Sequence, residues 1–95
     1  MRIFRQGDVV LREVEELPKE AVEVEGEDTL SISGETGQLH VLPRVKVATM
    51  PDWTKFVVLP EEGGVMTHPE HPPLVLPPRL IARVERVRSI TPFID

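Results

Sequence analysis

Ten prolines in a chain of 95 residues are the feature that most limits how this sequence can fold. A proline costs the interior of a helix about 3 kcal/mol, and eight of the ten stand after position 50. Val, Ile and Leu make up 28 residues, and 14 of these are Val. Branched side chains of this kind fit a pleated, half-buried surface better than a helix. We therefore expect strands, with little or no helix.

Short apolar or alternating runs recur along the chain and are separated by turn residues. Ala21–Glu25 alternates cleanly, whereas Phe56–Leu59 is uniformly apolar. About seven or eight short strands at this spacing are typical of a small antiparallel barrel or a two-sheet sandwich. Strands do not alternate with long helices, which argues against a parallel α/β fold. The length predicts a single all-β domain covering residues 1–95.

Composition narrows the functional classes. The chain has no cysteine, so it holds no disulfide and no thiolate metal site. The net charge of −5 argues against a nucleic-acid binder. No apolar run reaches membrane length and no leader opens the chain, so we expect a cytoplasmic protein without a membrane partner. Few thermolabile side chains and many prolines suggest a thermophilic source, although a GC-rich genome explains them equally well.

Charge is unevenly distributed. Half of the sixteen acidic residues lie in residues 13–28, named here the acidic segment. The last strand, expected over residues 80–90, carries a basic stripe of Arg83, Arg86 and Arg88, which a β-bulge near Glu85 would turn outward together. Trp53 is expected to be a core or interface anchor. These features predict a homo-oligomer with complementary surfaces, or a stripe that binds a small anionic ligand.

The three histidines of the chain are the strongest candidates for chemistry. His68 and His71 lie three residues apart in a segment expected to be a loop braced by prolines, and His40 lies on an expected strand. Three converging imidazoles would suit a divalent transition metal, namely Zn²⁺, Fe²⁺, Ni²⁺ or Cu²⁺. A fourth ligand would be water or one of three acids. These acids are Glu70, Glu35 and Glu61. The alternative is three histidines with no shared role.

Strand parity does not decide where His40 points. If the neighbours Leu39 and Val41 face the core, His40 faces solvent, because successive side chains alternate. If His40 and Leu42 face inward instead, the site is enclosed.

Four motifs appear in order along the chain. They are Arg5-Gln6-Gly7-Asp8-Val9, Gly34-Glu35-Thr36-Gly37-Gln38-Leu39-His40, His68-Pro69-Glu70-His71-Pro72-Pro73-Leu74 and Leu76-Pro77-Pro78. In order and spacing they resemble a family of small uncharacterised bacterial and phage-associated proteins. That family's pattern reads Gln-Gly-Asp-Val, Gly-Glu-x-Thr-Gly-His-x-His, His-Glu-Glu-His-x-Pro and Leu-Pro-x-Gly.

The histidine part of this pattern is similar to the metal-binding arrangement of cupin barrels. The resemblance implies that His40, His68 and His71 are metal ligands. Gln38 stands where the family has its first histidine, and its amide would serve as a further ligand or hold a water molecule or a partner.

The leading interpretation is a cupin-like module that binds a metal or a small molecule through the histidine cluster. The metal would act as a Lewis acid towards an anionic or carbonyl ligand. No residue is singled out as a general base, so the sequence leaves open whether the protein is an enzyme. The alternative is a non-catalytic homo-oligomeric interaction module without metal. A third interpretation is a phage-derived accessory protein that binds another protein or nucleic acid.

Overall fold

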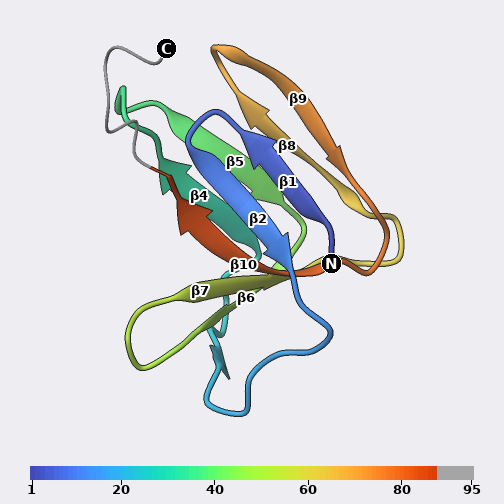
Figure 1. Ribbon diagram of the computed structural model, residues 1–95. Coiled ribbons are helices and arrows are strands. Elements are labelled where there is room, and N and C mark those ends of the chain that lie inside the picture. Colours follow the sequence, from blue (N-terminus) through green and yellow to red (C-terminus); the bar gives the residue numbers. More distant parts are fainter. Residues whose placement is uncertain (88–95) are drawn as a thin grey trace.

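The protein was analysed as a computed structural model that describes residues 1–87 (Figure 1). This part contains no helix, as expected, and ten strands, which is more than the seven or eight expected. The strands are β1 (Ile3–Gln6), β2 (Val9–Glu13), β3 (Val22–Glu23), β4 (Thr29–Ser33), β5 (Leu39–Pro43), β6 (Lys46–Thr49), β7 (Lys55–Val58), β8 (Gly64–His68), β9 (His71–Leu76) and β10 (Ile81–Arg86). No helix of the described chain has the length and hydropathy needed to cross a membrane.

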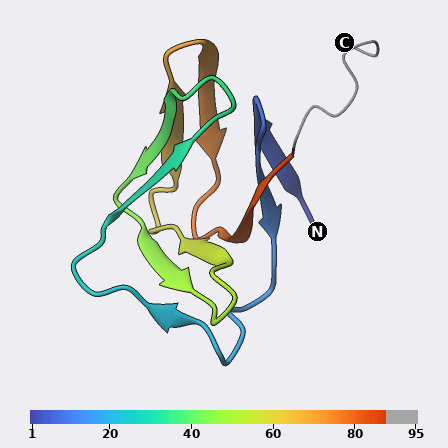
Figure 2. The ribbon, with the colours of Figure 1, turned by 90° about the vertical axis from the view of Figure 1, so that its left-hand side faces the viewer.

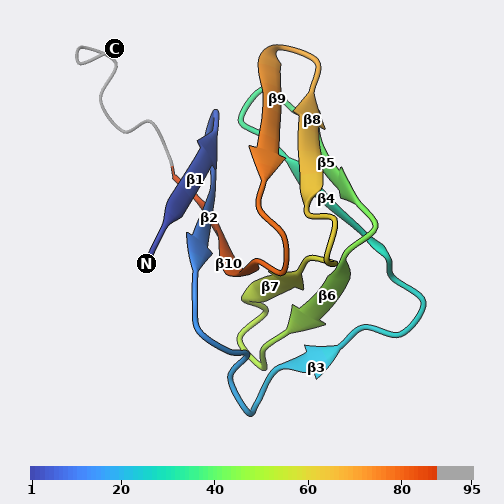
Figure 3. The same cartoon turned by 90° about the vertical axis from the view of Figure 1, so that its right-hand side faces the viewer.

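The strands form two antiparallel sheets. The larger has the order β1-β2-β10-β7-β6-β3, and the smaller has the order β4-β5-β8-β9. The larger sheet is bent, so that β1 and β2 face the smaller sheet while β7, β6 and β3 lie below both (Figures 2 and 3). The fold is therefore a sandwich, and the alternative of a closed barrel is wrong for the described chain.

The core lies between the two sheets. Val9 and Leu11 of β2 and Val57 of β7 are fully buried on one side, and Leu42 of β5 and Met66 of β8 are fully buried on the other. Burial of a side chain of this size contributes about 1.5–3 kcal/mol. The apolar runs that predicted strands in the sequence thus supply the packing that holds the sandwich together.

The segment 68–73 is not the loop that the prolines suggested. Only Pro69 and Glu70 form the turn, because His68 ends β8 and His71 begins β9. Pro72 and Pro73 are tolerated within β9 because it is an edge strand of the smaller sheet, where a missing N–H is not needed on the outer side. This hairpin adds strands to the seven or eight expected.

The predicted bulge near Glu85 is also wrong. β10 pairs with β2 without interruption from Ala82–Glu13 to Arg86–Val9. Val87, which the bulge was meant to bring to the core, is 38% exposed. The irregularity lies in β8 instead, between Met66 and His68. The basic-stripe residue Arg88 lies outside the described residues.

Three hairpin turns meet at one end of the sandwich. They are the β1–β2 turn at residues 7–8, the β4–β5 turn at residues 34–38 and the β8–β9 turn at residues 69–70. Figures 1 and 3 show all three at the same end of the molecule. Because each hairpin reverses the chain at this level, residues distant in sequence are brought together here.

The N-terminal strand is fastened to β2 by an ion pair. Arg2 donates to Glu13 Oε1 from Nε at 3.0 Å and to Oε2 from Nη2 at 2.8 Å. These bonds, together with that from the Arg2 backbone N–H, lower the pKa of Glu13 to about 2.

We predict that the side-chain carboxyl of Glu13 titrates near that pKa in an NMR pH series. Its contribution to stability is present above the unfolded pKa of about 4.5 and is lost as pH falls towards 2. In Arg2→Gln the pKa should return towards the ordinary value. An ordinary Glu13 pKa in the unmodified chain would show that the ion pair does not form in solution.

Candidate functional site

All three histidines of the chain meet at the end of the sandwich where the three turns lie. The ring centroids of His40 and His68 are 4.3 Å apart, those of His68 and His71 4.5 Å, and those of His40 and His71 6.0 Å. They come from β5, the end of β8 and the start of β9. The convergence that the sequence analysis required is therefore present in the fold.

The structure also shows which side chains of β5 face the interior. His40 is 1% exposed and Leu42 is fully buried, whereas Leu39 is 49% exposed. His40 thus faces the interior, which is the enclosed arrangement of the two that the sequence allowed.

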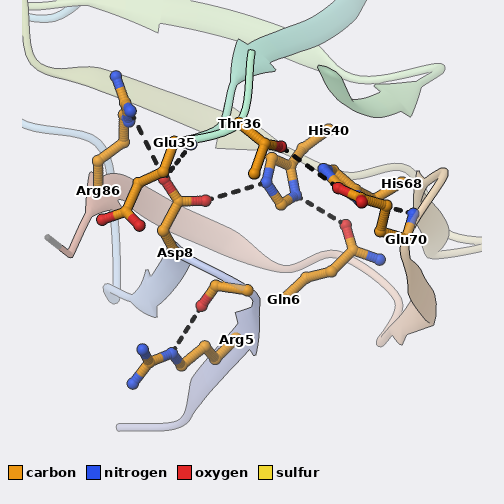
Figure 4. Close-up of polar contacts among 10 residues, drawn as sticks. Arg5, Gln6, Asp8, Glu35, Thr36, His40, His68, Glu70 and Arg86 are labelled. Atoms are coloured by element: carbon orange, nitrogen blue, oxygen red, sulfur yellow. Dashed lines mark hydrogen bonds and ion pairs between the residues drawn. The ribbon is translucent and has the colours of Figure 1, made fainter. Parts of the chain in front are cut away.

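Gln6 organises the buried side of the cluster. Its Nε2 donates to the carbonyl oxygens of Met66 and Pro72, both at 2.9 Å. Its Oε1 lies 3.0 Å from Nδ1 of His40 (Figure 4). Because the two carbonyls fix the amide, Oε1 must accept and His40 Nδ1 must carry a proton. The side chain also satisfies the backbone next to the irregularity in β8.

Asp8 occupies the other side of the His40 ring. Its Oδ1 lies 3.2 Å from His40 Nε2, and its Oδ2 accepts from the Glu35 backbone N–H at 3.0 Å. Arg86 of β10 stands 3.5 Å from the same Oδ2 (Figure 4). The carboxylate therefore joins the β1–β2 turn to the β4–β5 turn and to the end of β10.

The protonation of the pair follows from its surroundings. Burial lowers the pKa of His40, and the hydrogen bond with Asp8 only partly opposes this. Burial raises the pKa of Asp8. Hydrogen bonds with its own backbone and with His40, together with the charge of Arg86, outweigh this effect and bring the pKa below its ordinary value. Burial thus favours the neutral His40 ring, whereas the contact between Nε2 and Asp8 Oδ1 favours a proton on Nε2 in addition to the one on Nδ1.

Two glycines keep space open beside these groups. A Cβ at Gly34 would lie 3.0 Å from His40 Nε2 and 3.1 Å from Asp8 Oδ1. A Cβ at Gly7 would lie 2.5 Å from Nε2 of His71. Any larger residue at position 34 would fill the position next to both the nitrogen and the carboxylate. Steric crowding at this site thus explains why the two motifs carry glycine at positions 7 and 34.

The other two histidines differ in how they are held. Nδ1 of His68 accepts from the Glu70 backbone N–H at 3.0 Å, so Nε2 carries the proton of the neutral ring. His71 is exposed, and its ring makes no hydrogen bond with any described residue. His71 is therefore the ring of the cluster that can reorient at the lowest cost.

A pocket of about 440 Å³ opens beside the cluster. Its wall includes both of these histidines, the carboxyl-bearing residues Asp8, Glu35 and Glu70, and Arg5. Thr36 Oγ1 donates to Glu70 Oε1 at 3.3 Å, which links the β4–β5 turn to the β8–β9 turn. Acidic groups and imidazoles thus share one concave surface.

The remaining residues suggested by the sequence are distributed as follows. Glu35 and Glu70 lie at the pocket, but Gln38 is not part of its lining and its carbonyl accepts from Gly34 N–H. Glu61 lies in the β7–β8 turn, where it forms an ion pair with Arg79. Trp53 and Arg83 line a different hollow.

Sequence reasoning missed Gln6 and Asp8. Both lie in the motif Arg5-Gln6-Gly7-Asp8-Val9, which carried the family resemblance, but neither side chain was assigned a role. The signal that could have found them is an amide and a carboxylate on either side of a turn glycine, since such polar groups need partners when buried.

The donor atoms are close but do not yet surround one point. Among residues 1–87, no three histidine, cysteine or acidic groups are placed so that they could hold a metal ion.

Residues 5–79 match the family described as Domain of unknown function (DUF8820). The chain belongs to this family. An uncharacterised family was expected from the motifs, and the family description states no activity. Neither a curated protein nor a solved structure matches the chain.

Proposed function

We propose that this DUF8820 domain is a small binding module that takes up a divalent transition metal ion at the histidine cluster. The observation that carries the proposal is the placement of the ring nitrogen His40 Nε2 opposite the carboxylate oxygen Asp8 Oδ1 at 3.2 Å. A metal ion held between the two atoms would be bound by both. A proton shared between them accounts for the same distance, so the two must be separated by experiment.

The separation of the two atoms supports a metal ion. Two ligands in a tetrahedral site with bonds of about 2.0–2.1 Å lie about 3.3 Å apart, and the observed distance is 3.2 Å. Gly34 leaves the adjacent space open, where a Cβ would stand 3.0 Å from the nitrogen and 3.1 Å from the oxygen. The spacing of the two atoms and the space beside Gly34 therefore both support the proposal.

His71 would be the third ligand. Two imidazoles on one ion place their centroids about 5 Å apart, and those of His40 and His71 are 6.0 Å apart. A movement of roughly 1 Å by the exposed His71 ring would close the difference. His68 would remain packed between the other two rings, because its Nδ1 is engaged by Glu70.

This donor set favours particular ions. Two imidazoles and one carboxylate are ligands that suit Zn²⁺ and Fe²⁺, two of the four ions expected from the sequence. Remaining coordination positions would open to the pocket of about 440 Å³. Arg5 on its wall could pair with a small anionic ligand of the metal.

We predict that Zn²⁺ binds the metal-free protein with one site per chain in isothermal titration calorimetry. At a free concentration a hundred times the dissociation constant, the melting temperature should rise by about 10–20 °C, because binding then stabilises the folded state by about 2.7 kcal/mol. A chelator should reverse the shift.

Variants separate this site from adventitious binding. Gly34→Ala should abolish binding, because the added methyl fills the space for the ion, and a cooperative thermal transition of the apo variant would establish that it is folded. Glu61→Gln removes a carboxylate outside the pocket and should bind as the unmodified chain does. Equal binding by Gly34→Ala would contradict the proposal, and so would a melting temperature insensitive to Zn²⁺.

A further inference from the structure

The hairpin between β6 and β7 carries an unusual residue at its tip. Trp53 N–H donates to the carbonyl of Met50 at 2.9 Å, and Met50 N–H donates to that of Thr54 at 2.8 Å. Trp53 has a φ of 73°, the left-handed conformation that a three-residue hairpin loop needs at its last position. Glycine is the residue favoured there, because a side chain in this conformation is strained.

Packing within the chain does not account for the tryptophan. Its side chain is 81% exposed, so it buries little surface against its own fold. A large apolar side chain that is both strained and exposed destabilises the free domain. Such a residue points to a contact outside the described chain.

Trp53 lines a hollow of about 570 Å³. The lining also includes Arg83, Val84 and Arg86 of β10 and Lys55 of β7. Figure 1 shows the β6–β7 loop reaching out below β10 and β4. The lining holds three cations and one acid, Glu85. Arg83 pairs with Glu85 and Arg86 lies 3.5 Å from Asp8, so the hollow keeps a small net positive charge beside an aromatic surface. Two interaction residues that the sequence singled out separately, Trp53 and Arg83, therefore belong to one surface.

The opposite charge is found elsewhere on the same chain. Seven of the eight acids of the acidic segment, residues 13–28, are exposed. Only Glu13 of the eight forms an ion pair with a described residue, namely Arg2. None of the segment lines the hollow, so a chain does not fill its own hollow in this conformation.

We propose that the hollow between Trp53 and β10 docks the acidic segment of a second copy of this chain. Charge complementarity between the two surfaces selects this occupant, and the exposed indole supplies the apolar anchor that such interfaces need. Two equivalent contacts related by a twofold axis close the assembly as a dimer. Arg86 is shared between this hollow and Asp8 beside the histidine cluster, whereas Trp53 and the acidic segment lie outside the pocket at that cluster.

Sedimentation velocity over a wide concentration range tests the dimer. We expect reversible dimers that dissociate as salt is raised, because exposed charges are screened. Trp53→Gly should raise the dimer dissociation constant at least about tenfold, and its melting temperature should be equal or higher because the strain is removed. A monomer at all concentrations overturns the proposal, and so does a Trp53→Gly dimer of unchanged affinity.

A mixing experiment identifies the occupant, because Trp53 is the single tryptophan of the chain. The Trp53→Gly chain keeps the acids and has no indole fluorescence. A chain with Glu23→Gln, Glu25→Gln and Glu27→Gln keeps the indole and loses three acids. Each alone should be monomeric, and mixing them should shift the tryptophan emission to the blue. Unchanged emission in the mixture overturns the acidic segment as the occupant.

Discussion

Gln6→Leu is expected to lower the free energy of unfolding by roughly 3–5 kcal/mol, because each buried group left without its hydrogen bond costs about 1–3 kcal/mol. The side chain is 3% exposed and holds three partners. It donates to the carbonyls of Met66 and Pro72 and accepts from His40. Leucine has a similar size and removes all three hydrogen bonds. For a domain whose total stability is about 5–15 kcal/mol, this is a large loss.

Urea unfolding followed by circular dichroism measures the difference. Gln38→Leu is the matched control, since Gln38 is half-buried and its side chain makes no hydrogen bond with a described residue. The control should change stability by less than about 1 kcal/mol. Equal effects of the two substitutions would show that the Gln6 network does not hold the histidine end of the sandwich together.

Gly63→Ala is expected to destabilise the protein by about 3 kcal/mol or more, through a backbone clash added to strain. A Cβ at this position would lie 2.4 Å from the carbonyl oxygen of Leu76 and 3.1 Å from the carbonyl carbon of Pro77. Both contacts are with backbone, so no side-chain rotation relieves them. The φ of 74° adds the strain of the left-handed region.

Gly26→Ala separates the clash from the strain. Gly26 has a similar φ of 83°, but a Cβ there meets nothing within 4 Å. This control should cost about 1 kcal/mol, which is the strain alone. Thermal and urea unfolding of the two variants give the comparison. A Gly63→Ala variant no less stable than Gly26→Ala would show that the β7–β8 turn does not approach β9 as closely as described.

The fold class could be predicted because proline content and branched residues act locally. Alternation in Ala21–Glu25 and the apolar run Phe56–Leu59 mark strands that the structure contains. The pairing of strands distant in sequence could not be predicted, since it depends on how the two sheets pack. The bulge near Glu85 was predicted only to bury Val87, and this residue is exposed instead.

The site was predicted in part. Histidine is rare in this chain, and its chemistry drew attention to the three residues that the fold brings together. The orientation of His40 could not be predicted because Leu39, Val41 and Leu42 are all apolar. Either alternating set of side chains on this strand could therefore face the core. The role of Asp8 could not be predicted because an acidic residue next to glycine is common in turns. Its contact with His40 arises only when the β1–β2 and β4–β5 turns meet.

Long-range ¹H–¹⁵N NMR of the histidine rings during a Zn²⁺ titration tests the central claim most directly. The metal-binding proposal predicts that the Nε2 resonance of His40 moves and saturates at one equivalent of Zn²⁺, that a ring nitrogen of His71 moves with it, and that Nδ1 of His40 keeps its proton. In Gly34→Ala these resonances should stay in place. Imidazole resonances that respond to pH but not to Zn²⁺ would contradict the claim and identify the proton as the only cation that this pocket takes.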